Sequence, residues 1–142
     1  MNTHPLIQAY NASNAFGQLL GMTFNILSPG NIVYSLRVTA EHLATPLAAH
    51  GGCIGALVDA TLGVTALSVV CENNQVVSTI EYKVNFLAPA LCNDELDARG
   101  KIIQQGRRIL VVQCEVLAKN RNVMVAQAMG TFNAYDAAKA GY

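Results

Sequence analysis

The residues best suited to chemistry lie in one apolar stretch, residues 50–71. It opens with His50-Gly51-Gly52 and continues through about twenty small or apolar residues, among which Asp59 carries the one charge. Because no face of this stretch is polar, it predicts a helix that other structure surrounds. A carboxylate buried there costs several kcal/mol unless it is paired or used, so Asp59 needs either a partner or a role.

The two glycines stand where this helix would begin. Backbone amides in the first turn of a helix have no acceptor within the helix, and the helix dipole adds partial positive charge there. Glycine also allows a substrate to approach the backbone closely. We therefore expect the amides of Gly51 and Gly52 to stabilise an oxyanion. His50 joins this candidate catalytic set, although its position favours a structural role as a cap.

Asp59 can act as a general base on water or as a nucleophile, and the sequence leaves both open. Gly52 and Asp59 are seven residues apart, so they share a helix face about 10 Å apart along the axis. One carbonyl cannot reach both groups, whereas antiparallel helices in a two-fold dimer would bring Asp59 of one subunit to the Gly51 amide of the other. A structural role for Asp59, satisfied by Thr61 or by backbone amides, is the alternative.

The elements that must position these residues follow an α+β pattern within a single domain, residues 1–142. An antiparallel sheet should curl around the helix. Residues 1–15 should form an N-terminal flap with a short helix, and the tail 136–142 should fray. In the strand 76–87, alternation places Thr79 and Lys83 on one face, and Tyr82 and Phe86 on the other. Strands are expected at residues 22–27, 32–38, 76–87, 94–104, 107–117 and 123–135.

Composition narrows the class of protein. Apolar residues make up 52% of the chain and charged residues only 13%, so we expect another subunit to cover part of the surface. The net charge is zero and no basic cluster exceeds Arg107-Arg108, which disfavours nucleic-acid binding. The helix at 50–71 carries Asp59 and no flanking Lys or Arg, which disfavours a membrane span. The N-terminal residues do not resemble a signal peptide.

Metal and disulfide chemistry are also disfavoured. The four cysteines stand 18, 21 and 22 residues apart and form no CxxC pair, so neither a zinc site nor a disulfide framework is expected. The three histidines have no second ligand at metal-binding spacing. Reduced thiols fit a cytoplasmic protein best.

Four segments together resemble the PaaI-like branch of the hotdog-fold acyl-CoA thioesterases over roughly residues 15–135. They are HGG at 50–52 with Asp59 nine residues after His50, TIEYKVNFLAPA at 79–90, GRRILVVQCEV at 106–116 and VAQAMGTFNAY at 125–135. The resemblance implies a hotdog fold and hydrolysis of acyl-CoA or acyl-carrier thioesters to a carboxylic acid and a thiol. It also implies an active site shared across a homodimer, and dimers of dimers are common among such relatives. Coenzyme A is then part of the substrate, and no separate cofactor is expected.

Several residues take roles from this resemblance. Thr79 matches a position where relatives carry Ser or Thr that reaches toward the water or the carboxylate. Lys83, Arg107 and Arg108 are candidates to contact the phosphates of coenzyme A, with solvated surface charges as the alternative. Tyr10 either lines an acyl pocket or packs the flap.

One departure from the family supports a second hypothesis. Relatives often have Asn six residues before the histidine, where this chain has Ala44. The loss of that hydrogen-bonding group favours an acyl-CoA binding or sensing protein with little turnover. A dehydratase is disfavoured, because no Asp-x-x-x-x-His element occurs.

Overall fold

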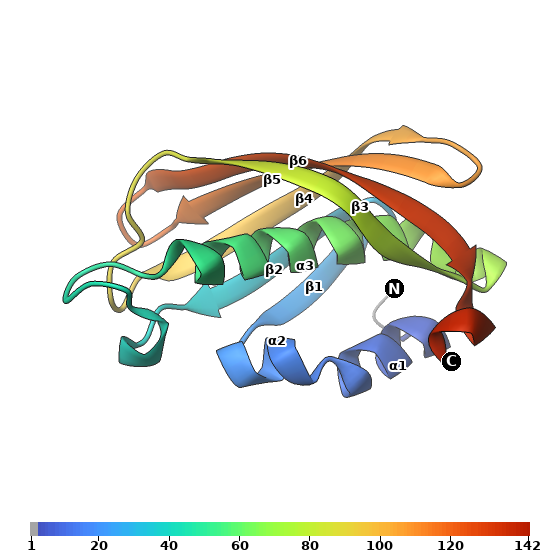
Figure 1. The fold of residues 1–142 in the computed structure, drawn as a ribbon, viewed down its shortest axis with the longest axis horizontal. Helices are drawn as coiled ribbons and strands as arrows, with labels where there is room; N and C mark the ends of the chain where they lie inside the picture. The colour runs from blue at the N-terminus through green and yellow to red at the C-terminus, as the bar shows by residue number, and fades with distance from the viewer. Residues whose placement is uncertain (1–2) are drawn as a thin grey trace.

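The structure, a computed structural model that describes residues 3–142, is a six-stranded antiparallel sheet curved around one long helix, α3 (Figure 1). This confirms the predicted α+β layout. The sheet has the strand order β1-β2-β4-β5-β6-β3, so β1 and β3 form its two edges. In chain order the elements are α1 Pro5–Ser13, α2 Ala15–Leu20, β1 Thr23–Ser28, β2 Asn31–Arg37, η1 Ala40–His42, α3 Gly51–Val70, η2 Cys71–Asn73, β3 Gln75–Phe86, β4 Glu95–Gln105, β5 Ile109–Ala118, β6 Val123–Asp136 and η3 Ala137–Ala140.

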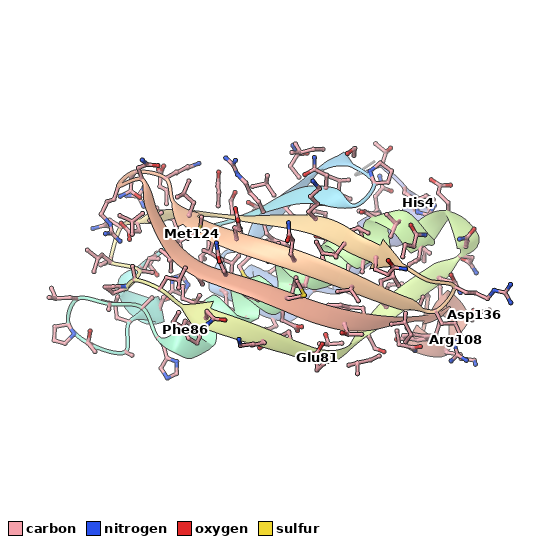
Figure 2. All side chains as sticks on the ribbon, turned by 90° about the horizontal axis from the view of Figure 1, so that it is seen from above. His4, Glu81, Phe86, Arg108, Met124 and Asp136 are labelled. Atoms are coloured by element: carbon pink, nitrogen blue, oxygen red, sulfur yellow. The ribbon has the colours of Figure 1, made fainter. Side chains whose placement is uncertain are left out.

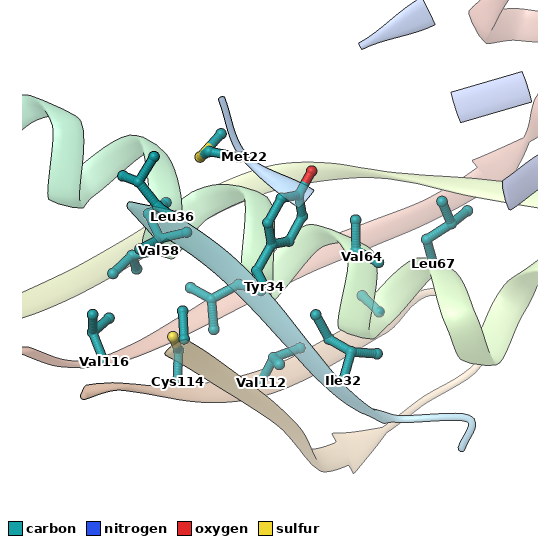
Figure 3. Close-up of a cluster of buried hydrophobic side chains, with 14 of the residues drawn as sticks. Met22, Ile32, Tyr34, Leu36, Val58, Val64, Leu67, Val112, Cys114 and Val116 are labelled. Atoms are coloured by element: carbon teal, nitrogen blue, oxygen red, sulfur yellow. The ribbon is translucent and has the colours of Figure 1, made fainter. Parts of the chain in front are cut away.

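Helix α3 is the core element of the fold. It is long and apolar enough to cross a membrane by length and composition, but 72% of its most apolar window is buried inside the protein. Figure 3 shows Val58 and Val64 of α3 packed among buried side chains of the sheet such as Ile32, Tyr34 and Val112. The fold therefore accounts for the apolar character of the helix.

The least buried side of α3 is a strip of small residues around one acid. Gly52 is exposed, and Ala56, Asp59, Ala60 and Gly63 are half-buried. These positions recur at helical spacing, so they lie on one face of the helix. Asp59 is thus not enclosed within its own protomer, and its side chain opens toward this strip.

The close approach of α3 to the sheet depends on Gly100 in β4. A Cβ atom at this position would overlap the Thr65 hydroxyl and come within 3.2 Å of the Thr61 carbonyl oxygen. That hydroxyl in turn donates to the Thr61 carbonyl at 2.6 Å. The absence of a side chain at Gly100 therefore sets how near the helix lies to the sheet.

A bulge in β3 changes which side chains face the helix. Thr79 pairs with Phe132 and Glu81 with Thr131 on β6, which leaves Ile80 as an extra residue. A bulge of this kind reverses the alternation of faces beyond it. The prediction that Thr79 faces away from Tyr82 and Phe86 is therefore wrong: Thr79 bonds to Asp59 of α3, and the other two side chains lie over Gly55 and Gly51 of the same helix.

The two terminal segments contain more helix than expected. A second short helix, α2, precedes β1, because the Asn14 side chain accepts from the Gly17 amide and Gly21 ends the helix at φ 78°. The tail, expected to fray, forms η3, in which the Asp136 side chain caps the Ala138 amide. Within the expected flap, α1 begins at Pro5, and residues 1–2 lie outside the described part of the chain.

Candidate active site

The start of α3 offers one free backbone amide. His50 has extended geometry and its Nδ1 accepts from the Gly52 amide at 2.7 Å, which is the capping role that the sequence favours. The amides of Cys53 and Ile54 both donate to the His50 carbonyl. Over residues 3–142 no acceptor is recorded for the Gly51 amide. Of the two glycines in the expected oxyanion site, Gly51 is therefore the one whose amide remains available.

The second reactive group is a carboxylate held by a hydroxyl. The Thr79 Oγ1 of β3 donates to Asp59 Oδ1 at 2.8 Å. The bulge at Ile80 lets β3 present Thr79 to the helix at this level. In residues 3–142 no hydrogen bond is recorded to Asp59 Oδ2, so that oxygen can accept a proton or attack a substrate. The contact between Thr79 and Asp59 is the one that the sequence suggested.

These two groups stand apart on one rigid helix. Gly51 and Asp59 are eight residues apart, which corresponds to about 12 Å along the helix axis. Strand β3 runs antiparallel beside them. A Cβ at Gly51 would lie 3.7 Å from the Phe86 ring, and one at Gly55 would lie 3.5 Å from the hydroxyl of Tyr82. A single protomer therefore does not bring the amide and the carboxylate to the same atom.

Each group has its own hollow. Asp59 and Thr79 line a cavity of about 320 Å³ whose walls include Tyr10, Gly63, Phe132 and Tyr142. This volume is at the lower end of the range for small-molecule pockets. Burial raises the pKa of Tyr10 above its usual range, so its hydroxyl stays neutral. Tyr10 thus lines the cavity, as one of its two expected roles requires.

A second hollow lies beside the helix start. A groove of about 380 Å³ runs past Gly51 and Ile54 of the helix and Phe86 and Pro89 of the following segment. No residue that lines it has a polar side chain, so its polar atoms come from the backbone. The groove can hold an extended apolar or amide-bearing chain next to the free amide.

The basic candidates lie in two different places. Tyr82 faces the helix, so the next residue of the strand, Lys83, points to the outer face of the sheet. There it lines a shallow groove with Gln113 and Met129. Arg107 and Arg108 lie exposed in the β4–β5 connection. Figure 2 shows Arg108 beside Asp136 at the end of the sheet opposite Phe86. The structure does not bring Lys83 together with Asp59.

Other nucleophiles and ligands serve the core or cap helices. Burial raises the pKa of the Cys53 thiol, which makes it a poor nucleophile. His4 Nε2, Cys71 Sγ and a Glu72 oxygen lie within 4.8 Å of one another. However, His4 Nδ1 accepts from the Leu6 amide, which in a neutral ring puts the proton on Nε2 and removes the lone pair that a metal would need. We therefore assign His4 to helix capping.

Comparison with known proteins places the chain in a family. A family model described as the thioesterase superfamily matches residues 48–125, which include both α3 and β3. The chain belongs to the thioesterase superfamily. The acyl-coenzyme A thioesterase PaaI of Escherichia coli is 25% identical over 124 residues, covering 87% of this chain and 82% of that protein. A candidate esterase of Saccharolobus solfataricus, SSO2140, is 33% identical over 89 residues, 63% of this chain; the match spans 61% of that relative's own length.

Solved structures confirm the hotdog fold. The E. coli PaaI protein superimposes with a TM-score of 0.83 at 23% identity, covering 90% of this chain and 89% of that one. The protein smu.793 of Streptococcus mutans, solved bound to acetyl-CoA, superimposes with a TM-score of 0.73 at 23% identity, covering 81% and 89% of the two chains. The predicted PaaI-like hotdog assignment is therefore confirmed.

Proposed function

We propose that this protein hydrolyses acyl-CoA thioesters in a site built from two protomers, with Asp59 and Thr79 from one and the Gly51 amide from the other. The observation that carries the proposal is that one helix holds both a carboxylate oriented by Thr79 and a free amide, at Gly51. The two groups are too far apart to act together within one chain. Membership of the thioesterase superfamily and the acetyl-CoA bound to smu.793 support the substrate class.

The edge strand β3 supports this dimer. Within residues 3–142 no strand pairs with its outer side, and Ile80, Tyr82 and Phe86 on it are 55%, 39% and 58% exposed. Such an edge favours pairing with another strand. It adjoins the small-residue strip of α3, so a second copy can cover both.

A two-fold axis at the middle of β3 produces the composite site. Tyr82 faces Gly55, which is midway between Gly51 and Asp59 on α3. Antiparallel pairing of β3 with its copy around Tyr82 sets the partner's Phe86 opposite Ser78. The partner's Gly51, next to that phenyl ring, then lies beside Asp59. The same operation creates a second, equivalent site.

The reaction uses only water and these groups. Asp59 takes a proton from water as the water oxygen attacks the thioester carbonyl carbon, and the Gly51 amide donates to the oxyanion that forms. Collapse of this intermediate breaks the carbon–sulfur bond, and the leaving thiolate takes the proton from Asp59. In the nucleophilic alternative, Asp59 attacks the carbonyl carbon and expels the thiolate of coenzyme A; water then hydrolyses the mixed anhydride, which frees Asp59 and supplies the proton that the thiolate takes. Neither route needs a metal or a further cofactor, since coenzyme A is part of the substrate.

The apolar groove beside Gly51 fits the pantetheine arm of coenzyme A, whose chain is uncharged. Arg107 and Arg108 are our candidates for its phosphates. Ile109, the residue after Arg108, pairs with Asn133 of β6, and Asn133 pairs with Ser78 of β3. The arginines are therefore two strand spacings, or about 10 Å, from the strand that holds Thr79. Lys83, on the outer face, has a weaker claim. The four free cysteines fit a cytoplasmic location.

The direct test measures thiol release from a panel of aliphatic and aryl acyl-CoAs. Asp59→Asn and Asp59→Ala should each lower kcat about a hundredfold or more, while both variants keep the wild-type melting temperature within a few degrees. Equal activity in all three proteins would remove Asp59 from the mechanism. Tight acyl-CoA binding without thiol release from the wild type would favour the sensing protein, the function that Ala44 suggests.

The composite nature of the site has its own test. Protomers carrying Asp59→Asn are unfolded and refolded together with protomers carrying Gly51→Pro, which removes the amide hydrogen. Random pairing makes half of the dimers mixed, and each mixed dimer holds one intact site, so about a quarter of wild-type activity should return. No recovery in a mixture shown to contain mixed dimers would contradict a shared site.

A further inference from the structure

The cavity at Asp59 runs along one face of helix α3. Asp59, Gly63 and Leu67 all line it, and their spacing of four residues puts them in a row on one helix face. The row spans eight residues, or about 12 Å along α3. The reacting thioester sits at the Asp59 end, so an acyl group extends along this row toward Leu67.

Residues 137–142 close the far end of this cavity. Their backbone is held there because the Ala137 amide donates to the Asn74 carbonyl at 3.1 Å and the Tyr142 amide donates to the Ala137 carbonyl at 3.3 Å. Ala140 and Tyr142 line the cavity. The Tyr142 hydroxyl lies 3.0 Å from the Ser13 hydroxyl of α1.

Tyr10 of α1 also lines this cavity. It lies one helical turn before Ser13, whose hydroxyl contacts that of Tyr142, and burial raises the pKa of Tyr10. Two terminal segments thus meet across the end of the cavity, which lies beyond the matched family segment, residues 48–125.

We propose that Tyr142 and η3, set against Tyr10, form a size-limiting end wall that determines the longest acyl group this enzyme accepts. This inference rests on the proposed thioesterase function and assigns the substrate range of that same site. The wall is adjustable without damage to the core, since Tyr142 is 42% exposed.

A substitution at Gly63 changes the same cavity independently of the end wall. It sits midway along the row, and a Cβ there would make ordinary contact with the Phe132 ring at 3.5 Å. Gly63→Ala should therefore fold and narrow the cavity without changing its end wall. Opening the wall and narrowing the row should shift the acyl preference in opposite directions.

The first assay measures kcat/KM for butyryl, octanoyl, dodecanoyl and hexadecanoyl thioesters of CoA. The second measures, by calorimetry, the Kd of the matching S-alkyl-CoA thioethers, which cannot be hydrolysed. Tyr142→Ala should raise the ratio of long-chain to short-chain kcat/KM roughly tenfold or more, the effect of one or two methylenes in an apolar pocket. Gly63→Ala should lower that ratio several-fold. The matched control is Lys139→Ala, an exposed residue of η3 that does not line the cavity, and it should keep the wild-type ratio.

The two assays separate the two proposals. If the wild type hydrolyses no ester but Tyr142→Ala relaxes the length limit for thioether binding, the thioesterase function fails and the end wall stands. If the wild type hydrolyses esters and Tyr142→Ala has the wild-type length profile in both assays, the end wall is overturned. Failure of the wild type to hydrolyse any ester, together with failure of every thioether to bind, would overturn both.

Discussion

The substitution Gly51→Pro isolates the proposed oxyanion donor. Proline has no amide hydrogen, and it suits the first position of a helix because that amide has no acceptor within the helix. The residue before a proline must be extended, and His50 already has φ −61° and ψ 134°. The side-chain space is open as well, since the nearest atoms to a Cβ at Gly51 are those of the Phe86 ring at 3.7 Å.

The expected effect is large on catalysis and small on stability. Loss of one oxyanion donor lowers kcat by roughly a hundredfold to a thousandfold, equivalent to about 3–4 kcal/mol. Replacing a glycine by proline where the backbone already fits stabilises a protein by about 0.4–1 kcal/mol, because the unfolded chain loses freedom. No amide hydrogen bond is lost over the described residues, since none is recorded for Gly51. The melting temperature should therefore stay constant or rise slightly.

The matched control is Gly51→Ala, which adds a Cβ but keeps the amide hydrogen. Both variants are assayed for thiol release on the best acyl-CoA of the panel, with melting temperature and dimer mass measured in parallel. We expect Gly51→Ala to stay within a few-fold of wild type and Gly51→Pro to lose at least a hundredfold in kcat. A folded, dimeric Gly51→Pro variant with the activity of Gly51→Ala would refute the assignment of this amide.

Three further predictions follow from other contacts. Thr79→Ala should lower kcat about tenfold by removing a hydrogen bond to a charged group, and Thr79→Ser should restore most of it; equal rates for the two variants would exclude a positioning role. Hydrogen bonds from Arg121 hold the pKa of Asp94 at about 2, below its usual 3.8. The stability that they add is therefore complete above pH 3.8 and is lost as the pH falls through 2. When the unfolding free energy is measured against pH, the wild type should lose about 2 kcal/mol in this range and Asp94→Asn should not. Gly100→Ala should cost about 1–3 kcal/mol in chemical denaturation by overpacking against the Thr65 hydroxyl, and Thr65→Ala in the same chain should recover part; a neutral single variant would show that the helix can move away.

The order of elements and the contact between Thr79 and Asp59 were accessible from the sequence. A helix without a polar face must be surrounded, and alternating strands must supply the surrounding sheet, so residues 50–71 and the six strands follow from hydrophobic pattern alone. The predicted ends of the strands at 76–87 and 123–135 lie within one residue of β3 and β6. Thr79 came from resemblance to the family, since no spacing rule connects it to Asp59.

The bulge at Ile80 was not accessible, because alternation is a local pattern and a bulge is a property of two paired strands. The sequence from Val77 to Phe86 alternates without interruption, yet Ile80 of β3 has no partner between the consecutive residues Phe132 and Thr131 of β6. Packing against α3 selects this register, since Thr79 bonds to Asp59 and the side chains of Tyr82 and Phe86 lie over glycines of the helix. The sequence of β3 alone therefore does not predict the position of the bulge.

The choice between the two glycine amides was also beyond the sequence. Both amides lie in the first turn and either could be free by position alone. The ring orientation of His50, whose Nδ1 accepts from Gly52, decides which one remains. Similarly, the ordered tail at residues 137–142 has contacts with Asn74 and Ser13, which are remote in sequence, so its composition alone suggested fraying.

Helix geometry explains why such a site should need two chains. A free amide exists only in the first turn of a helix, because every later amide is bonded to a carbonyl four residues earlier. The carboxylate needs a hydroxyl donor and a cavity for the substrate, and both are found at the middle of α3, where Thr79 and the cavity lie. The two requirements are met about 12 Å apart on one rigid helix. In the dimer that we propose, a two-fold axis midway between them, at Gly55, brings the amide of one chain to the carboxylate of the other without bending the helix. It uses β3, whose outer edge pairs with no strand of residues 3–142.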